Sequence, residues 1–331
     1  MSVRTGQKIK ILALLDILRR ESDEDHPISA AKIGELLARQ GITAERKVIY
    51  DDIAKLTEYG YDIIHTRVPA SGYYLASRDF ELPEIYLLTD AVQAANFITV
   101  KKTRDLIGKL DSLLSREQAK KREKGIYIDS GRKCDNEEIY YNIDKLSEAI
   151  STSKKVELTY RVRAITDGRK IGFVEKQHKI SPYALIWQND HYYLVGNHEK
   201  YDNLMHIRVD RMKRVAVTDE TTRHFSEVSQ YTDRFDIADY AMHSFNMYAG
   251  ELVEVTLDCD EKALEQIVDR FGENIFITDR ENGRFTFRAK ALLSKGLVDW
   301  LLQFYPDVRV KSPQKLKDML KQRIDKLKEI L

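Results

Sequence analysis

The sequence has few cysteines and no long apolar run. Its 331 residues include only Cys134 and Cys259, which lie far apart and fit a reducing compartment better than a disulfide-stabilised scaffold. No stretch is long and uncharged enough to suggest a membrane span, and no signal-peptide pattern is present. We therefore expect a cytoplasmic protein without a membrane partner.

Catalytic motifs and metal-ligand patterns are also missing. The sequence has no phosphate loop, no Rossmann glycine fingerprint and no zinc-protease motif. His191, His198 and His206 are close in sequence, but no cysteine or carboxylate stands at metal-site spacing beside them. Asp51 and Asp52 are consecutive, so on a helix they diverge and cannot act as an acid–base pair. The sequence therefore predicts no enzyme, no cofactor and no metal.

The charge is unevenly distributed. The net charge of the whole chain is only +1, whereas residues 151–217 carry 13 lysines and arginines against 7 aspartates and glutamates, a net of +6. A basic module inside a near-neutral protein indicates a local polyanion partner. The length allows two or three domains with substantial cores.

The first sixty residues carry three helical patterns. Residues 8–21 place isoleucines and leucines in a broad stripe of helical period, and Ser29 is placed to cap a second helix that runs to Arg39. Gly41 then turns the chain, and Thr43 is expected to cap a third helix. Two short helices joined by a tight glycine-containing turn are typical of a helix-turn-helix, whose second helix lies in the major groove of DNA.

A short hairpin is predicted after these helices. Residues 61–65 and 73–75 have strand character and are joined by a turn, which is the pattern of a wing that reaches phosphate or the minor groove. The alternative is a small three-helix module with another role, because residues 1–78 have a net charge of only +1 and DNA-binding domains are usually strongly basic. The candidate DNA contacts are Thr43, Glu45, Arg46, Lys47 and Tyr50 at the third helix and Arg67 on the wing.

The middle and the end of the chain have different patterns. Two amphipathic helices, at 84–97 and 102–114, and the charged run 116–124 suggest a connector, in which the run is a solvated helix end or a linker. Another helix, at 136–151, leads into the basic β-rich module. After an aromatic segment at 231–248 without a clear period, strands and helices alternate as a βαββα unit. A final helix from Pro313 carries an apolar stripe that packs on its own domain or on a partner chain.

The stretch 181–215 concentrates aromatic residues and arginines. Its first half predicts a hairpin of residues 183–187 and 192–196. In the later run 206–210, alternation places Arg208 and Asp210 on one face of a strand, and Arg211 follows. Two guanidiniums with a carboxylate to orient them suit a planar anionic ligand such as a nucleotide. The alternative is a half-solvated strand with surface ion pairs.

These residues resemble those of a known family, the bacterial transcriptional regulators with an N-terminal winged helix-turn-helix and a WYL domain. Tyr192, Tyr193 and Leu194 stand where the family has Trp-Tyr-Leu, so the first position departs from the pattern but remains aromatic. The other two family signatures are matched by Ser181-Pro182-Tyr183 and by Arg208-Val209-Asp210-Arg211. Stretches near the N-terminus, ISAAKIGELL, ERKVIYDDIAKL and SGYYLASRDF, are similar to the family's DNA-binding part.

The resemblance implies a small barrel of the Sm or SH3 type whose basic pocket senses nucleotides or nucleic-acid fragments. It also implies a C-terminal extension that helps to form homodimers. For Tyr193 the role of a buried barrel residue remains an equal alternative. The pocket residues carried over from the family are Tyr193, Arg208 and Arg211, with Tyr183 and His178 beside them.

We therefore expect an α+β multidomain chain and a ligand-responsive regulator. A homodimer would bind a double-stranded operator, and a nucleotide or single-stranded nucleic acid would be the effector. The alternative is an accessory protein that captures single-stranded RNA on the basic barrel; a nuclease is a third possibility but finds no metal-ligand cluster. The predicted parts are a winged helix-turn-helix at 1–80, a helical connector at 81–135, a WYL ligand-sensing domain at 136–220, an interdomain segment at 221–248 and a C-terminal βαββα extension at 249–331.

Overall fold

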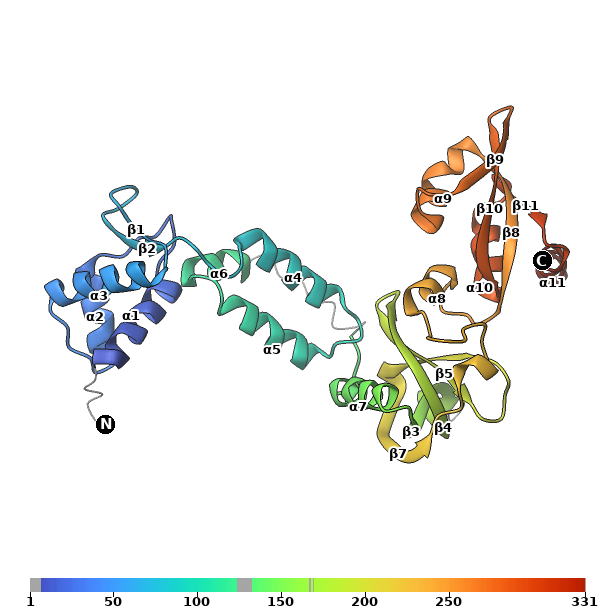
Figure 1. Ribbon diagram of the computed structural model, residues 1–331, viewed down its shortest axis with the longest axis horizontal. Helices are drawn as coiled ribbons and strands as arrows, with labels where there is room; N and C mark the ends of the chain where they lie inside the picture. The colour runs from blue at the N-terminus through green and yellow to red at the C-terminus, as the bar shows by residue number, and fades with distance from the viewer. Residues whose placement is uncertain (1–6, 124–132, 167, 169, 331) are drawn as a thin grey trace. The chain divides into compact units, whose positions relative to one another are not determined.

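The computed structural model describes residues 7–123, 133–166, 168 and 170–330, and Figure 1 shows them as a ribbon. The chain divides into two compact units, Met1–Asp135 and Asn136–Leu331, and we describe each by itself. Helices and antiparallel sheets are both present, which confirms the predicted mixed α and β class. Within the described ranges, no helix is long and apolar enough to cross a membrane.

The first unit begins with three helices and a hairpin. Ser29 caps the second helix, because its side chain accepts a hydrogen bond from the Lys32 amide at 3.2 Å, as predicted. The third helix begins later than expected, at Arg46 with Glu45 in the N-cap position, so the predicted cap Thr43 was wrong. The segment before it stays extended while burying Ile42 in the core. The elements are α1 (Gln7–Glu21), α2 (Ala30–Arg39), α3 (Arg46–Tyr59), β1 (Ile63–Thr66) and β2 (Gly72–Leu75).

A buried ion pair joins α1 to α3. The Lys10 ammonium lies 2.9 Å from a carboxylate oxygen of Asp52, and the two side chains are only 11% and 2% exposed. Around the pair, the helices pack isoleucines and leucines into one core. Because each charge is withdrawn from water, each depends on the other for compensation. The orientation of α3 on α1 is therefore set by a polar contact as well as by apolar packing.

Three further helices complete the first unit: α4 (Leu82–Ala94), α5 (Val100–Asp111) and α6 (Arg116–Glu123). The charged run predicted as a helix end or linker is helix α6 as far as Glu123, and Lys124 lies outside the described residues. Helix α6 is tied to the end of α1 by ion pairs from Arg116 to Glu21 and from Lys121 to Asp25. The Ser115 hydroxyl also donates to the buried Asp23 carboxylate. These contacts attach the connector to the first helix.

The second unit contains a five-stranded antiparallel sheet in the order β6-β5-β4-β3-β7. The predicted hairpin is confirmed, since β4 and β5 pair from Gln188↔His191 onward around a two-residue turn. Within the described residues no ladder joins β6 to β7, so closure into a barrel stays a prediction. The elements are α7 (Ile139–Ser151), β3 (Lys154–Thr166), β4 (Lys170–Gln188), β5 (His191–His198), β6 (Met205–Arg208), a 3-10 turn (Val209–Arg211) and β7 (Met212–Thr221).

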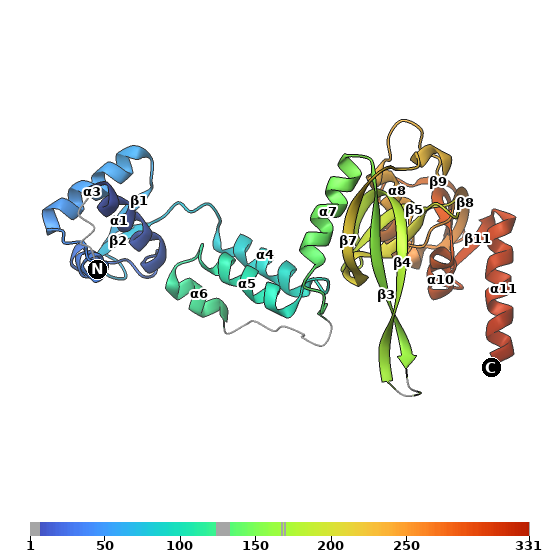
Figure 2. The same ribbon diagram turned by 90° about the horizontal axis from the view of Figure 1, so that it is seen from below.

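Strands β3 and β4 are much longer than the sequence patterns indicated. Only residues 156–161 were recognised as a strand, whereas β3 and β4 pair continuously to Thr166↔Lys170 and extend beyond the rest of the sheet (Figure 2). Ile165 and Ile171 face each other near the tip and are each 78% exposed. The projecting ends of β3 and β4 are therefore held by cross-strand pairing and not by burial in a core. Because neither face is buried there, the sequence lacks the alternation of polar and apolar residues that marks a half-buried strand.

A four-stranded antiparallel sheet, in the order β11-β8-β10-β9, ends the chain. The predicted turn at Asn282 and Gly283 is confirmed, with both residues at positive φ. Strand β11 was missed, so the unit is βαββαβα. The elements are β8 (Glu251–Asp260), α9 (Leu264–Phe271), β9 (Phe276–Glu281), β10 (Arg284–Leu293), α10 (Lys295–Gln303), β11 (Val308–Ser312) and α11 (Gln314–Ile330).

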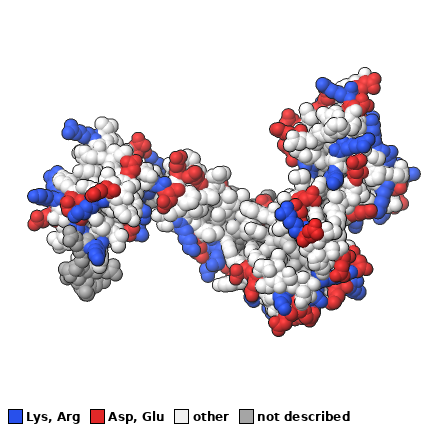
Figure 3. Space-filling view, in the orientation of Figure 1, with Lys and Arg blue, Asp and Glu red and all other residues white. Residues whose placement is uncertain are grey.

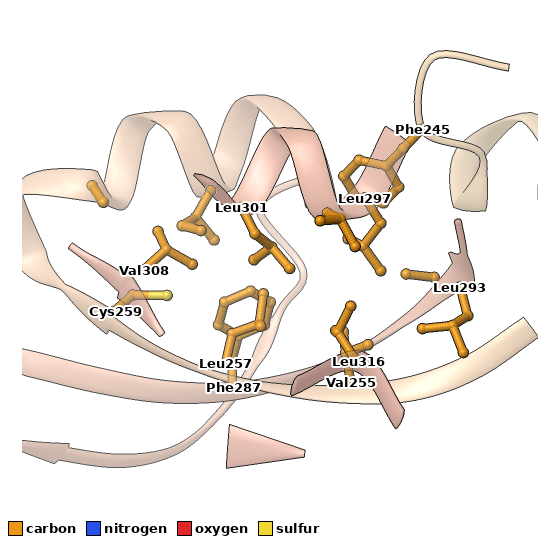
Figure 4. Close-up of a cluster of buried hydrophobic side chains, with 14 of the residues drawn as sticks. Phe245, Val255, Leu257, Cys259, Phe287, Leu293, Leu297, Leu301, Val308 and Leu316 are labelled. Carbon is orange, nitrogen blue, oxygen red and sulfur yellow. The ribbon is translucent and has the colours of Figure 1, made fainter. Parts of the chain in front are cut away.

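One apolar core holds this terminal sheet to its helices. Phe287 and Leu257 point from the sheet toward Leu297 of α10, as Figure 4 shows. Leu316 at the start of α11 is fully buried in the same cluster, whereas Leu327 near its end is 47% exposed. The first turns of the last helix thus pack on its own domain, and the later part of its apolar stripe remains uncovered in the single chain.

The segment between the two sheets of the second unit contains a short helix, α8 (Ile237–His243), which the sequence did not indicate. Tyr231, Phe235 and Tyr240 pack in one cluster with Val195 of the first sheet and Leu292 of the second. Because these side chains contact both sheets and each other, their spacing follows no single helical or strand period. The segment is a packed layer and not a free linker.

We expect Asp52→Ala to destabilise the first unit by about 3 to 5 kcal/mol, because it leaves the Lys10 ammonium buried without a counter-charge. The matched control is Asp51→Ala, which removes an exposed carboxylate paired with Lys55 and should have little effect. Hydrogen exchange of the α1 and α3 amides measures the difference, with exchange about a hundredfold to several thousandfold faster only for Asp52→Ala. Equal exchange in both variants would show that the buried pair contributes nothing.

Candidate functional site

The predicted contacts at the start of α3 are all at the surface. Thr43, Glu45, Arg46, Lys47 and Tyr50 are exposed, with Thr43 and Glu45 just before the helix. Arg46 is oriented by its own helix, since its Nε donates to the Tyr50 hydroxyl at 2.6 Å and its guanidinium lies 5.5 Å from the centre of that ring. A guanidinium held in this way loses less freedom when it meets a partner.

Ring contacts connect α3 to the hairpin that follows it. The Tyr50 ring lies 6.1 Å from the Tyr73 ring on β2, and Tyr73 lies 4.7 Å from His65 on β1. Burial, and then the neighbouring Tyr50 hydroxyl, raise the pKa of Tyr73. Arg67 follows β1 and is exposed. The first unit therefore presents Arg46, Lys47 and the hairpin from one connected framework.

The charge on this unit is mixed and not gathered on one face. On the face shown in Figure 3, lysines and arginines are interspersed with aspartates and glutamates. Exposed pairs such as Lys55 with Asp51 and Arg39 with Glu35 account for part of this pattern. Any attraction for a polyanion must therefore come from the placement of a few cations that lack an intramolecular partner, among which Lys47 and Arg67 have no ion pair within the described residues.

In the second unit, a second cluster forms where β5, β6 and the 3-10 turn meet. Register places Tyr193 opposite Arg208. The Arg208 guanidinium donates two hydrogen bonds to the Asp210 carboxylate, from Nε to Oδ1 at 3.0 Å and from Nη2 to Oδ2 at 2.6 Å. The predicted strand 206–210 was two residues too long, because β6 ends at Arg208 and Val209 turns inward with no exposure. The predicted orientation of the guanidinium by Asp210 is nevertheless present.

Arg211 differs from Arg208 in its contacts. Within the described part of the chain it makes no hydrogen bond or ion pair, and it lies close enough to influence the pKa of both His191 and Tyr193. Burial raises the pKa of Tyr193, while the nearby Arg208 opposes that change. The Tyr193 hydroxyl likewise makes no hydrogen bond to another described residue. The cluster therefore combines one fixed guanidinium, one free guanidinium and a half-buried tyrosine ring.

Two residues of this cluster were missed by sequence reasoning, Gln188 and His191. They face each other at the end of the β4–β5 hairpin, around a turn in which Asn189 and Asp190 both have positive φ. Gln188 Oε1 and His191 Nδ1 are buried without a hydrogen-bond partner among the described residues. Burial, and then the charge of Arg208, lower the pKa of His191, so its ring is neutral at pH 7. The turn residues Asn189 and Asp190 predict that Gln188 and His191 pair across the hairpin, but nothing in the sequence predicts that their side chains are buried.

Two residues carried over from the family are placed differently. Tyr183 is 7% exposed, its ring packs against Phe225 and Phe235, and its hydroxyl donates to the Arg223 carbonyl at 2.9 Å. Burial raises the pKa of Tyr183 to about 12. Its contacts among the described residues are those of a core side chain, and they do not bring it to Arg208 or Arg211.

His178 contacts Tyr160, which in turn contacts Arg208. Its ring meets those of Tyr160, at 6.1 Å, and His198, at 5.7 Å. Tyr160 in turn accepts a weak hydrogen bond of 3.4 Å from the Arg208 amide. Burial, and then the neighbouring His198, lower the pKa of His178. Among the ring contacts and hydrogen bonds of the described residues, Tyr160 is the link between His178 and the cluster.

A hydrogen-bonded histidine connects this sheet to the segment that covers it. His206 Nδ1 meets the Met247 carbonyl at 2.5 Å, and Nε2 meets the Tyr240 hydroxyl at 2.7 Å. A neutral ring satisfies both contacts, donating through Nδ1 and accepting at Nε2. Burial lowers the pKa of His206. His206 thus holds the covering segment against β6, next to Arg208.

Each unit also has a cleft that contains none of the predicted ligand contacts. In the first, about 350 Å³ is lined by arginines and aspartates that include Arg19 and Arg78. In the second, about 420 Å³ lies beside Tyr231 and Tyr240. The described residues include no group of three or more histidines, cysteines, aspartates or glutamates that could hold a metal ion.

Comparison with known proteins identifies two domains in the second unit. The family model of the WYL domain matches residues 141–217, and that of the WCX domain matches residues 251–328. No curated protein matches the sequence. Among solved structures the chain is similar to proteasome accessory factor B/C (PafBC) of Arthrobacter aurescens, at 17% identity with a TM-score of 0.27. That alignment covers 96% of this chain but only 46% of the other, so the chain spans about half the length of that relative.

We expect the second unit to lose stability as the pH falls below about 6.5, since the unfolded chain protonates His206 there while the folded chain resists it. His206→Gln keeps a donor for Met247 and an acceptor for Tyr240, so it should reduce the fall in melting temperature between pH 8 and pH 5.5. The control His224→Gln alters an exposed ring and should leave the fall unchanged. An unaltered pH dependence in His206→Gln would contradict this role.

Proposed function

We propose that the protein is a transcriptional regulator whose DNA affinity is controlled by a nucleotide or nucleic-acid fragment bound in the WYL domain. The observation that carries the proposal is the cluster of Arg208, Arg211 and Tyr193, with the unpaired polar atoms of Gln188 and His191 beside it. The cluster lies on β4, β5, β6 and the following 3-10 turn, all within the residues that match the WYL model. The matched WCX domain supports the same family of regulators.

The chemistry of the cluster favours an anionic ligand with a flat ring. Arg208 is already neutralised by Asp210, so Arg211 is the group that would pair with a phosphate. The half-buried Tyr193 offers an aromatic face on which a base stacks, an interaction worth about 1 to 3 kcal/mol per base. The net charge of +6 over residues 151–217 would add long-range attraction.

The first unit supports DNA binding through its order of elements. Three helices followed by a hairpin correspond to a winged helix-turn-helix, in which α3 would enter the major groove and the hairpin would lie beside it. Arg46, Lys47 and Tyr50 would then face base edges or phosphates, and Arg67 the flanking backbone. The low net charge of this unit makes these few contacts decisive, because little non-specific attraction supplements them.

Control of DNA binding requires that the effector bind one conformation better than another. A homodimer with two α3 helices would recognise a two-fold operator, and the effector would shift the dimer toward the state it prefers. The exposed Ile324, Leu327 and Ile330 on α11 offer an apolar stripe for a second subunit. The coupling between effector and operator would then be reciprocal.

The alternative is an accessory protein that captures single-stranded RNA at the same cluster. The contrast between a near-neutral first unit and a basic segment at 151–217 favours this reading. Such a protein would bind RNA without sequence preference and would have no operator. Transcriptional control is distinguished from it by DNA sequence specificity.

Arg211→Ala should abolish the response to single-stranded oligonucleotide without unfolding the domain, because Arg211 makes no hydrogen bond or ion pair to another described residue. Arg208→Ala should abolish the same response and also lower the melting temperature, since it removes two hydrogen bonds that the guanidinium donates to the Asp210 carboxylate, which is 10% exposed. Fluorescence anisotropy with a labelled oligonucleotide and thermal unfolding measure the two effects.

The control for both arginines is Arg214→Ala, which removes an exposed guanidinium paired with Glu175. It should bind the oligonucleotide almost normally. If Arg211→Ala and Arg214→Ala bind equally well, the assignment of the effector site is wrong. Basal binding to DNA through the first unit should be the same in all three variants.

Arg46→Ala should weaken operator binding by about 1 to 3 kcal/mol if the guanidinium contacts a base. The matched control is Arg288→Ala on β10 of the second unit, which is exposed and should leave the affinity unchanged. Quantitative footprinting on an operator fragment measures both. An Arg46→Ala footprint identical to that of the wild type would rule out a base contact by this residue.

A further inference from the structure

Tyr193, Arg208 and Arg211, together with Gln188 and His191, are called the effector cluster below. At one end of it, Gln188 and His191 each have a buried polar atom without a hydrogen-bond partner among the described residues. These atoms are Gln188 Oε1 and His191 Nδ1. Folded proteins pair nearly all their buried polar atoms, so two adjacent exceptions require a reason. Both residues are only partly buried as a whole, so each also presents part of its side chain at the surface.

The two side chains lie on the same face of the hairpin as the rest of the cluster. Gln188 and His191 are direct cross-strand partners, and His191 and Tyr193 are two residues apart on β5 with their rings 6.4 Å apart. Tyr193 is in turn opposite Arg208. The order along this face is therefore amide and imidazole, then tyrosine ring, then guanidiniums. A nucleotide has the same order, with a base edge, a base face and a phosphate.

The unpaired atoms specify what the base edge must supply. Gln188 Oε1 can only accept a hydrogen bond, and a neutral imidazole nitrogen without its proton accepts as well. Adenine and cytosine each carry an exocyclic amino group that donates two hydrogens. Thymine offers only one N–H, which lies between two carbonyl oxygens, so one hydrogen would have to serve two buried acceptors while the flanking oxygens face them.

We propose that Gln188 and His191 form a base-reading subsite that selects nucleobases with an exocyclic amino group over thymine and uracil. The inference rests on the proposed effector function, because it assumes that a nucleotide occupies the cluster. It adds a specificity that a purely electrostatic and stacking site would lack, since phosphate contacts and ring stacking are tolerant of sequence.

The test uses the full chain and three labelled single-stranded octamers, of deoxycytidine, deoxyadenosine and thymidine, measured by fluorescence anisotropy. We expect the wild-type protein to bind the deoxycytidine and deoxyadenosine octamers about tenfold more tightly than the thymidine octamer. Gln188→Met and His191→Phe keep the volume of the side chains but remove the hydrogen-bonding atoms. Each variant should bind the deoxycytidine and deoxyadenosine octamers more weakly and the thymidine octamer as tightly as the wild type. The ratio of the affinities should therefore fall toward one.

The matched controls are Gln266→Met on α9 and His224→Phe, both at exposed positions, which should keep the wild-type preference. The dependence of affinity on salt gives a second measure. It should remain at its wild-type slope in Gln188→Met and become shallower in Arg211→Ala, because only Arg211 is assigned to a phosphate. Far-UV circular dichroism and the melting temperature verify that each variant is folded.

The outcomes separate this inference from the proposed function. If the wild-type protein binds all three octamers equally, or prefers thymidine, the base-reading subsite is wrong while the effector site stands. If Gln188→Met and His191→Phe retain the full preference, another part of the chain reads the base and the inference is again wrong. If the wild-type protein binds none of the octamers, the proposed effector function fails and the subsite fails with it.

Discussion

The double hydrogen bond between Arg208 and Asp210 is the constraint on which the proposed effector cluster depends. It occurs where β6 gives way to the 3-10 turn, and it fixes one guanidinium against a largely buried carboxylate. Because Asp210 neutralises Arg208, the free positive charge falls on Arg211. The same turn buries Val209, which anchors the cluster to the core of the sheet. A structural pair thus leaves a second arginine available for a ligand.

Much of this arrangement could be predicted from the order of residues. The β4–β5 hairpin follows from two β-prone runs around Asn189 and Asp190. Strand alternation predicted that Arg208 and Asp210 lie together, and they do, although Asp210 lies in the 3-10 turn and not on the strand. The WYL and WCX matches agree with the resemblance carried by the three signatures. The first three helices follow from apolar periodicity, because their apolar residues pack into one core.

The remaining features depend on contacts that local patterns do not contain. Whether Gln188 and His191 are buried depends on register and on what covers the hairpin, and Tyr183 enters the core because Phe225 and Phe235, far along the chain, pack against it. Thr43 was mistaken for a cap because burial of Ile42 holds the chain extended to Glu45. Such outcomes are set by tertiary packing, which overrides local capping preference.

The central claim is that one chain couples recognition of a nucleic-acid fragment to binding at a specific DNA site. Genome-wide mapping of the DNA bound by the wild-type protein, with and without DNA damage to raise the level of single-stranded fragments, tests it most directly. The account predicts enrichment at a few two-fold symmetric sites whose occupancy changes when fragments accumulate. Absence of any enriched site, together with sequence-tolerant binding to RNA, would contradict it.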